Sequence, residues 1–281
     1  MDAKIKATLK KQAVAVRKDI VTAVHGAKSG HPGGSLSLAD TLTYLYFYKM
    51  NVNPKDPKDP ERDRFVLSKG HTAPALYSVL AEKGYFDKSE LLSLRKAGAL
   101  LQGHPDMKHI PGVDMTTGSL GQGISAAVGM ALGGKISGKK YTVYTALGDG
   151  EIQEGQVWEA AMAAAHYGLD NLVAIVDNNN LQIDGKVSDV MSVYPITDKF
   201  ASFGWNVTTA DAHDFDSIDA AFEKTKEKNG KPWVIVQKSI KGKGVSFMED
   251  NAAWHGTAPN DEQYAIAMAD LDKIEAELEA E

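Results

Sequence analysis

Polar residues suited to chemistry follow two apolar runs that predict buried strands. Asp149 comes after the run 141–147, and Asn178 and Asn179 come after the run 172–177. Because the carboxyl ends of adjacent parallel strands meet at one edge of a sheet, a carboxylate and an amide oxygen would share a crevice there. Oxygen ligands of this kind suit Mg²⁺ or Ca²⁺, with diphosphate oxygens and water completing the coordination shell.

Two glycines, Gly148 and Gly150, flank Asp149 and would let the backbone come close to a phosphate. The following helix is expected to begin at Ile152 or soon after, so its positive end could face the same anion. A Gly-Asp-Gly sequence alone could equally be an ordinary turn, with the asparagines as loop formers. The helix and strand that separate it from Asn178 favour the ligand interpretation.

Four of the eight histidines lie in loops that are tight with glycine or proline, namely His31, His71, His104 and His255. A rigid backbone can fix the tautomer and the orientation of an imidazole, and imidazoles move protons at neutral pH. Taken singly, each such histidine is more often a loop or capping residue.

The remaining histidines are predicted to be structural. His25 is expected at a helix C-terminus, His166 on a helix beneath the metal-binding loop, and His109 and His213 in surface loops. The basic run 238–244 could approach a phosphate or could be a solvated loop.

The elements that would position these residues alternate between helix and strand. Apolar spacing predicts helices over 3–27 and 38–50 and from Asp261, with a charged, proline-rich surface loop at 53–60. Strands are predicted at 64–68, 141–147, 172–177, 205–209 and 233–238. This alternation predicts a three-layer α/β/α fold with a mostly parallel central sheet. We expect residues 1–281 to form a single domain.

The composition is that of an ordinary globular protein, with 43% hydrophobic and 24% charged residues. The 31 basic and 37 acidic residues give a net charge of −6, which argues against broad binding of nucleic acid or an anionic membrane. The absence of cysteine excludes disulfides, thiolate metal sites and a cysteine nucleophile. No apolar run is long enough to span a membrane, and the N-terminus lacks a secretory signal, so we expect a cytoplasmic protein.

Several motifs, taken together, resemble the transketolase family. The pairing of Gly148-Asp149-Gly150 with Asn178-Asn179 is similar to the signature of many enzymes that use thiamine diphosphate. The motifs that narrow the resemblance are Lys-Ser-Gly-His-Pro-Gly-Gly at 28–34, Ser-Lys-Gly-His at 68–71, Gln-Gly-His-Pro at 102–105, Thr-Thr-Gly-Ser-Leu-Gly-Gln-Gly at 116–123 and Trp-His-Gly at 254–256. The resemblance covers essentially the whole chain and implies the thiamine diphosphate-binding fold, in its diphosphate-binding form.

The resemblance implies a role for each matching position. Asp149, Asn179 and the carbonyl of Leu181 would bind the metal ion, expected to be Mg²⁺, with Ca²⁺ or Mn²⁺ able to substitute. The positions expected to contact thiamine diphosphate are His71, Gly118, Leu120, Asp149, Gly150, Asn179, Ile183 and Ile240. The expected catalytic residues, which would face the reacting carbon and the hydroxyls of the donor sugar, are His31, His104 and His255.

The resemblance also implies a split enzyme. In transketolases the glutamate that activates the cofactor comes from a second, pyrimidine-binding domain, and this chain ends at Glu281, where that domain would begin. We therefore expect the N-terminal subunit of a transketolase that works with a C-terminal subunit in a heterotetramer (α₂β₂). Together they would reversibly transfer a two-carbon ketol unit from a ketose phosphate to an aldose phosphate in the pentose phosphate pathway. The segment 121–132 would contact the partner or lie buried within this subunit.

Two alternatives stay open. A subunit related to 1-deoxyxylulose-5-phosphate synthase or to the 2-oxoacid dehydrogenases would share the cofactor signature, but the histidine motifs disfavour it. A non-catalytic cofactor-binding module would have no need for intact metal ligands and loop histidines.

Overall fold

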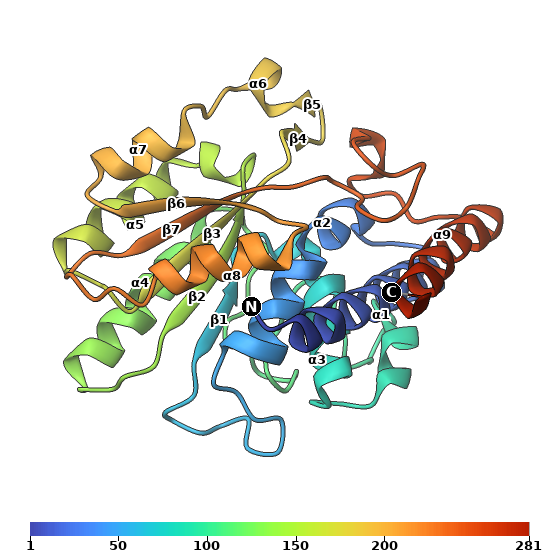
Figure 1. Cartoon of the computed structure of the whole chain (residues 1–281), viewed down its shortest axis with the longest axis horizontal. Coiled ribbons are helices and arrows are strands. Elements are labelled where there is room, and N and C mark those ends of the chain that lie inside the picture. The colour runs from blue at the N-terminus through green and yellow to red at the C-terminus, as the bar shows by residue number, and fades with distance from the viewer. Residues whose placement is uncertain (281) are drawn as a thin grey trace.

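The computed structural model describes residues 1–280 and places a five-stranded sheet between two layers of helices (Figure 1). The strands lie in the order β1-β2-β3-β7-β6, and every neighbouring pair is parallel. Their bounds are Arg64–Leu67 for β1, Val143–Gly148 for β2, Leu172–Asn178 for β3, Asn206–Asp211 for β6 and Trp233–Lys238 for β7. The predicted α/β class with a mostly parallel sheet is confirmed.

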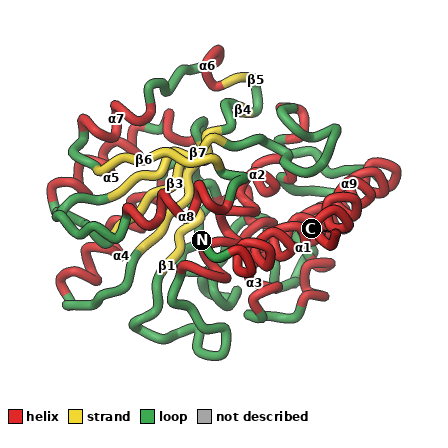
Figure 2. Tube along the Cα trace, in the orientation of Figure 1, coloured by secondary structure: helices red, strands yellow, loops and turns green. Residues whose placement is uncertain are grey.

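Helices cover both faces of this sheet (Figure 2). They are α1 (Ala3–Ala27), α2 (Pro32–Tyr44), α3 (Ala73–Lys83), α4 (Gln122–Ile136), α5 (Gly155–His166), α6 (Val187–Val190), α7 (Ile196–Ser202), α8 (Phe215–Lys224) and α9 (Asp261–Ala280). Short 3₁₀ segments occur at Gly70–Thr72, Lys88–Ser93, Glu151–Gln153 and Ala252–Trp254, and a π-helical turn at Leu45–Lys49 continues α2. None of the described helices is long and apolar enough to cross a lipid bilayer.

Each predicted strand is present, with ends that move by one or two residues at most. Strand β6 begins after Trp205, and the indole N–H of that residue donates to the Ala161 carbonyl of α5 at 2.8 Å. Two additional short strands, β4 (Leu181–Gln182) and β5 (Gly185–Lys186), form an antiparallel hairpin soon after β3.

The second helix begins at Pro32, earlier than the predicted Leu38. Proline is accepted in the first helical turn because no intrahelical hydrogen bond is lost there. Gly33 and Gly34, which suggested a loop, lie inside the helix because other segments pack tightly against it. A Cβ on Gly33 would lie 2.7 Å from the carbonyl oxygen of Trp254. These glycines therefore mark close packing and not a break in the chain.

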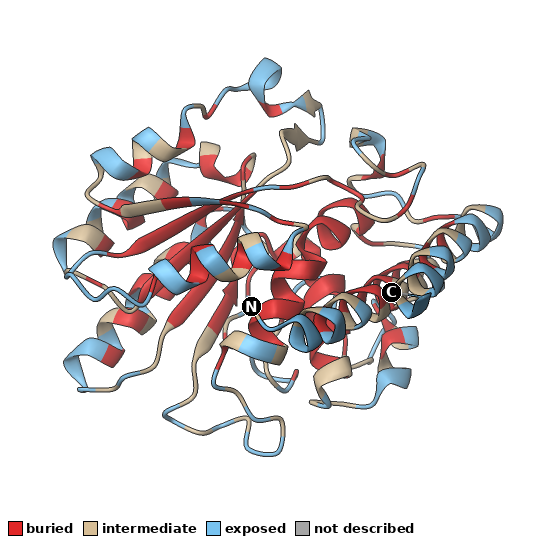
Figure 3. Ribbon diagram, in the orientation of Figure 1, coloured by how far each residue is buried: buried red, intermediate tan, exposed pale blue. Residues whose placement is uncertain are grey.

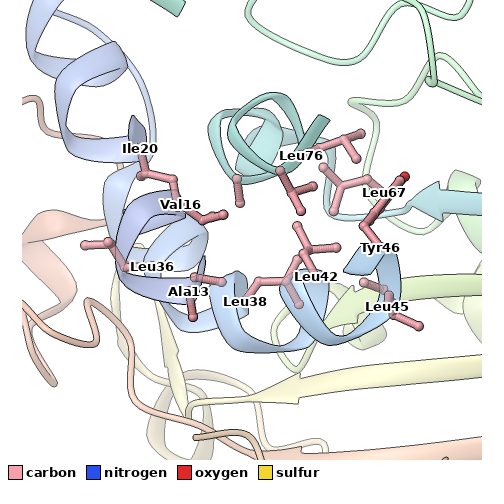
Figure 4. Close-up of a cluster of buried hydrophobic side chains, with 14 of the residues drawn as sticks. Ala13, Val16, Ile20, Leu36, Leu38, Leu42, Leu45, Tyr46, Leu67 and Leu76 are labelled. Carbon is pink, nitrogen blue, oxygen red and sulfur yellow. The ribbon is translucent and has the colours of Figure 1, made fainter. Parts of the chain in front are cut away.

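Alternate residues on each strand point into two separate hydrophobic cores. Phe65 and Leu67 of β1 belong to the core beneath α1, α2 and α3, whereas Val66 belongs to the core beneath α4 and α5. In the first core, side chains of α1 and α2 such as Val16 and Leu42 meet those of α3 and β1 (Figure 4). Helix α2 is buried along its whole length, which makes it the central element of this face (Figure 3).

Asp19 on α1 is a buried carboxyl group whose charge is poorly compensated. Burial and the neighbouring Glu82 raise its pKa to about 7, against the opposing effect of Lys88 at 2.9 Å. The folded chain therefore holds this proton more tightly than the unfolded chain does. It follows that the stability contributed by this group is present at low pH and is lost as the pH rises through about 7.

Asp19→Asn imitates the protonated group and should stabilise the chain at alkaline pH. We expect the free energy of unfolding to rise by on the order of 1 kcal/mol at about pH 8 and to change much less near about pH 4, where the carboxyl of the unfolded chain is also largely protonated. Urea unfolding at both pH values measures this, with Asp56→Asn in the exposed loop as the control. An equal effect of Asp19→Asn at the two pH values would contradict the assignment.

Candidate functional site

The carboxyl ends of the five parallel strands meet at one edge of the sheet, and polar residues follow each of them. These are Lys69 after β1, Asp149 after β2, Asn179 after β3, Lys241 after β7 and His213 after β6. Because β2 and β3 are adjacent, Asp149 and Asn179 lie at neighbouring strand ends, as the sequence predicts. The parallel sheet thus gathers side chains from segments far apart in the sequence.

Asp177, near the end of β3, is a fully buried carboxylate that joins several of these segments. Lys69 forms an ion pair with it, and the hydroxyls of Ser37 (2.6 Å) and Ser239 donate hydrogen bonds to it. The side-chain amide of Asn179 donates to the same carboxylate at 3.4 Å. Burial alone would raise the pKa of Asp177, but the Lys69 charge holds it below the ordinary value. The ionised carboxylate therefore ties the segments after β1 and β7 and helix α2 to the end of β3.

Asp149 is a buried carboxylate whose oxygens accept hydrogen bonds from backbone groups, the N–H of Gly150 at 2.9 Å and the N–H of Asn180. Burial and the negative charge of Asp177 raise its pKa to about 7. A raised carboxyl pKa means that the surrounding protein supplies too little positive charge to stabilise the ionised form. A divalent cation bound by Asp149 would supply that charge, so the residues fit the implied metal ion.

The turn after β3 carries the other predicted metal ligands. Asn179 Oδ1 accepts a hydrogen bond from the Leu181 N–H at 3.0 Å, and the Leu181 carbonyl accepts one from Lys241 Nζ at 3.2 Å. A cavity of about 640 Å³ borders this turn and reaches Ile240. Within residues 1–280, no group of three His, Cys, Asp or Glu side chains could hold a metal ion. A cation here would need further oxygen ligands from a bound molecule such as a diphosphate.

Three of the four loop histidines form one cluster. The ring centroids of His31 and His71 are 5.2 Å apart, those of His31 and His255 5.4 Å, and those of His71 and His255 5.0 Å. His31 directly precedes α2, His71 lies just after β1, and His255 follows the short helix Ala252–Trp254. A ligand that reaches one of these rings is therefore close to all three.

These three imidazoles are neutral at physiological pH. Burial, together with nearby positive charge that includes Lys241, lowers the pKa of His31 to about 4 and that of His255 to about 3. The same causes bring the pKa of His71 well below its ordinary value. A neutral imidazole can accept a proton from a substrate hydroxyl. His31 Nδ1 is buried without a hydrogen-bond partner in the described part of the chain.

His104 lies beside this cluster and is more exposed. Its ring covers the backbone of Gly118, where an added Cβ would lie 3.2 Å from the imidazole. Burial and the charge of Arg95 lower the pKa of His104, and Arg95 also acts on His31. Arg95 is not among the residues that the sequence singles out, because nothing in its local sequence distinguishes it from other exposed basic residues. Its relation to the histidines comes from the folding of the loop before His104.

Lys241 is a site candidate that the sequence leaves open. Its side chain is almost fully buried, and Nζ donates to His255 Nδ1 at 2.9 Å as well as to the Leu181 carbonyl. Burial and the neighbouring Lys69 lower its pKa to about 8. Lys238, in the same basic run, is exposed. The run therefore contains both a buried site lysine and a solvated one, and Lys241 links the histidine cluster to the metal-binding turn.

The other predicted cofactor contacts border the same edge. Gly150 follows Asp149, and a Cβ added to it would lie 3.3 Å from a neighbouring side chain. Leu120 and Ile183 have exposed apolar side chains, and Ile240 is half-buried. Exposed apolar groups of this kind are available for contact with a bound molecule.

Two of the predictions for the remaining histidines are wrong in part: His166 is on a helix and His213 is in a loop, as predicted, but neither has the predicted surroundings. His166 is the last residue of α5, at the end of that helix away from the metal-binding turn, and it is exposed. His213 is predicted in a surface loop, but its side chain is only 12% exposed and lies between α2 and the segment after β7. Its burial depends on elements distant in sequence, which local polarity does not reveal. The structural positions predicted for His25, in the last turn of α1, and for the exposed His109 are confirmed.

Comparison with known proteins relates the chain to enzymes of one kind. Residues 8–272 match the family model described as transketolase, thiamine diphosphate binding domain. The chain is 47% identical over 265 residues to the 6-deoxy-6-sulfo-D-fructose transketolase subunit SqwG of Clostridium sp. (strain MSTE9), covering 94% of this chain and 96% of that protein. It is 43% identical over 274 residues to one subunit of the apulose-4-phosphate transketolase of Phocaeicola vulgatus, covering 98% of this chain and 97% of that protein.

The fold is similar to that of a solved transketolase from Campylobacter jejuni, with a TM-score of 0.87 and 32% sequence identity. The superposition covers 99% of this chain and 47% of the C. jejuni chain. This chain therefore spans less than half the length of the solved transketolases that it matches. The two relatives named as subunits have nearly its own length.

The neutral state of the clustered histidines leads to a pH prediction. The ¹⁵N signals of His31 and His255 should not move between about pH 5.5 and about pH 7, because the pKa of each ring lies below that range and Lys241, which contacts His255, stays charged there. Nitrogen-15 NMR of the full chain measures this, and His31→Gln and His255→Gln identify the two sets of signals. A titration midpoint near the ordinary value of 6.5 for either ring would contradict the described burial.

The charge deficit at Asp149 leads to a binding prediction. Asp149→Ala should remove most of the affinity for thiamine diphosphate with Mg²⁺, by on the order of 10²-fold, because the bridging cation loses its charged ligand. Asn179→Ala should act in the same direction with a smaller effect. Calorimetric titration of the assembled protein measures both, and Asp184→Ala in the exposed β4–β5 turn is the control. Unchanged affinity in both site variants would contradict the assignment of the metal ligands.

Proposed function

Because this chain belongs to the transketolase family, in which it corresponds to the thiamine diphosphate-binding domain, we propose that it is the N-terminal subunit of a split transketolase. With a C-terminal subunit that carries the pyrimidine-binding domain, it would transfer a two-carbon ketol unit from a ketose to an aldose. The observation that carries this proposal is the cluster of His31, His71 and His255. Lys241 joins it to the Leu181 carbonyl, in the turn after β3 whose Asn180 N–H donates to Asp149.

The proposed chemistry divides between the cofactor and this chain. Bound thiamine diphosphate supplies the electron sink that ketol transfer requires. The donor hydroxyl must lose a proton when the carbon–carbon bond breaks, and the acceptor aldehyde oxygen must gain one when the new bond forms. His31 and His255 are neutral and close together, so each could hold such a proton. His104 would contact the sugar from the more exposed side.

The charges around the cluster support an anionic sugar as the substrate. Arg95 lies close enough to His31 and His104 to lower the pKa of both, and Lys241 lies on the other side of the cluster. The two relatives named above are described as acting on a sulfonated and on a phosphorylated sugar, and both of these are anions. We therefore propose a sugar phosphate or another sugar with a terminal anionic group. A role in the pentose phosphate pathway and a cytoplasmic location stay predictions.

The donors at the predicted metal site support a hard cation. One carboxylate of Asp149, one amide oxygen of Asn179 and the carbonyl of Leu181 are all oxygen ligands, which suit Mg²⁺ and also allow Ca²⁺ or Mn²⁺. We propose that Asp149 binds the cation directly and that Gly150 and His71 lie against the diphosphate.

The exposed face of α4 and α5 is the proposed docking surface for the partner subunit. Six of the fifteen residues of α4, among them Ile124 and Ala131, are buried within this chain, so this side of the segment 121–132 packs internally. On its exposed side, Gly129 and Gly133 have no neighbouring atom where a Cβ would lie. Glycine in an exposed helix lowers helix stability by about 1 kcal/mol relative to alanine. A partner that packs closely against this face would explain why glycine occurs at these positions.

The apolar surroundings of these glycines support the same partner. Met162 on α5 and Ile136 at the end of α4 are 58% and 77% exposed. Tyr167, whose carbonyl accepts a hydrogen bond from Lys135 at the end of α4, is 49% exposed. Exposed apolar groups that gather on one face generally mark an interaction site. A closed assembly with two copies of each subunit would complete two sites, in keeping with the usual symmetry of oligomers.

The function is tested by a two-carbon transfer assay with the partner subunit present and absent. His31→Ala and His255→Ala should lower turnover by roughly 10²-fold while leaving cofactor affinity nearly unchanged, if these rings carry protons. His104→Ala should weaken use of the donor sugar more than binding of the cofactor. His109→Ala, on the exposed surface, is the control. Full activity of the isolated chain, or normal turnover in all three site variants, would contradict the proposal.

The docking surface is tested by enlarging its glycines. Gly129→Leu and Gly133→Leu should raise the dissociation constant for the partner subunit by roughly 10-fold or more, because each added side chain would occupy space needed by the partner. Gly26→Leu, at an exposed helical position on α1 with equal free space, is the matched control. All three variants gain helix propensity, so a fall in affinity confined to α4 separates docking from stability. Equal affinity of all three variants would exclude this face.

A further inference from the structure

Two side chains from distant elements hold the backbone on both sides of Lys241. The Ile240 N–H donates a hydrogen bond to Nε2 of His213 at 2.9 Å, and Nε of Arg17 donates one to the Lys243 carbonyl at 3.1 Å. His213 lies in the turn between β6 and α8, and Arg17 lies on α1. The segment that carries Lys241 is thus held by side chains of α1 and of the β6–α8 turn, in addition to its connection to β7.

Asp40 on α2 connects these two side chains. Its carboxylate pairs with both terminal nitrogens of Arg17, one of them at 2.9 Å, and it lies 2.8 Å from Nδ1 of His213. Because the Ile240 N–H donates to Nε2, the ring hydrogen of His213 is on Nδ1 and is donated to Asp40. Burial opposes ionisation of Asp40, but Arg17 and His213 lower its pKa below the ordinary value. The carboxylate is therefore charged and accepts from both neighbours.

The held segment determines where the Lys241 side chain lies. Its Cγ passes over Gly33 of α2, where an added Cβ would lie 3.1 Å away, and the Gly242 N–H donates to the Gly33 carbonyl at 2.9 Å. The ammonium group then donates to Nδ1 of His255 and to the Leu181 carbonyl. Because Nδ1 of His255 accepts this hydrogen bond, the ring carries its hydrogen on Nε2.

We propose that Arg17, Asp40 and His213 form a positioning unit, which holds the segment 239–243 and through its lysine sets the tautomer of His255. The three side chains lie behind the segment and act through it, so they are positioning residues. The catalytic role of His255 rests on the proposed function. The claim that these three side chains hold the segment 239–243 does not depend on it. Loss of the unit should therefore loosen this segment and disturb one imidazole without unfolding the sheet.

Hydrogen exchange of the full chain tests the first half of this proposal. His213→Phe keeps a ring but removes both nitrogens, so amide exchange in the segment 239–245 should become faster by roughly 10-fold or more. Exchange in β3 should not change. His213→Gln retains an acceptor oxygen near the place of Nε2 and should restore much of the protection. His25→Phe removes another histidine bonded to an aspartate and is the matched control.

The ¹⁵N signals of His255 test the second half. In His213→Phe they should move away from those of a ring with its hydrogen fixed on Nε2, and His25→Phe should leave them in place. Asp40→Asn is a second variant, which preserves shape and should show both effects even if His213→Phe fails to fold.

Three results would overturn the proposal. They are unchanged exchange at 239–245 in both His213→Phe and Asp40→Asn, acceleration that extends equally to β3, and an unaltered His255 signal. These measurements need neither cofactor nor activity. A failed transfer assay with normal exchange results would therefore reject the proposed function and leave the positioning unit in place.

Discussion

The buried charge of Asp177 constrains every other part of the site. A carboxylate with no exposure to water is stable only if other groups compensate it, and here Lys69, Ser37 and Ser239 do so. Removing one partner of a buried ion pair typically costs about 3–5 kcal/mol, because the remaining charge is left without compensation. The segments after β1 and β7 and the start of α2 therefore cannot move independently of β3.

Close contact between backbones brings the histidine-bearing loops together. A Cβ on Gly70 would lie 2.7 Å from the backbone nitrogen of Gly118, and one on Gly33 would lie 2.7 Å from the carbonyl oxygen of Trp254. These contacts adjoin His71 and His255, so larger residues would push the loops apart. The close contact at Gly33 is one reason that the rings of His31 and His255 lie near each other.

The same positive charges have two effects on this site. Although the chain as a whole is acidic, Lys69 and Lys241 are buried at the edge of the sheet. Burial first, and then the charge of these lysines, lowers the pKa of His71 and His255, so both rings are neutral. The lysine charge also makes the edge attractive to an anion such as a diphosphate. Burial together with this arrangement of lysines therefore places neutral imidazoles next to an anion-binding region.

The fold class and the pairing of Asp149 with Asn179 follow from the amino-acid sequence alone. Alternating apolar runs specify parallel strands, and the ends of adjacent strands must meet. The motifs around four histidines likewise identify the loops that form the site. Local sequence contains no comparable signal for Arg95, Lys241 or His213, since each lies in a polar run typical of a surface loop. Which of these side chains is buried is settled in the folded chain, because the groups that cover and pair with them come from α1, α2 and other segments distant in the sequence.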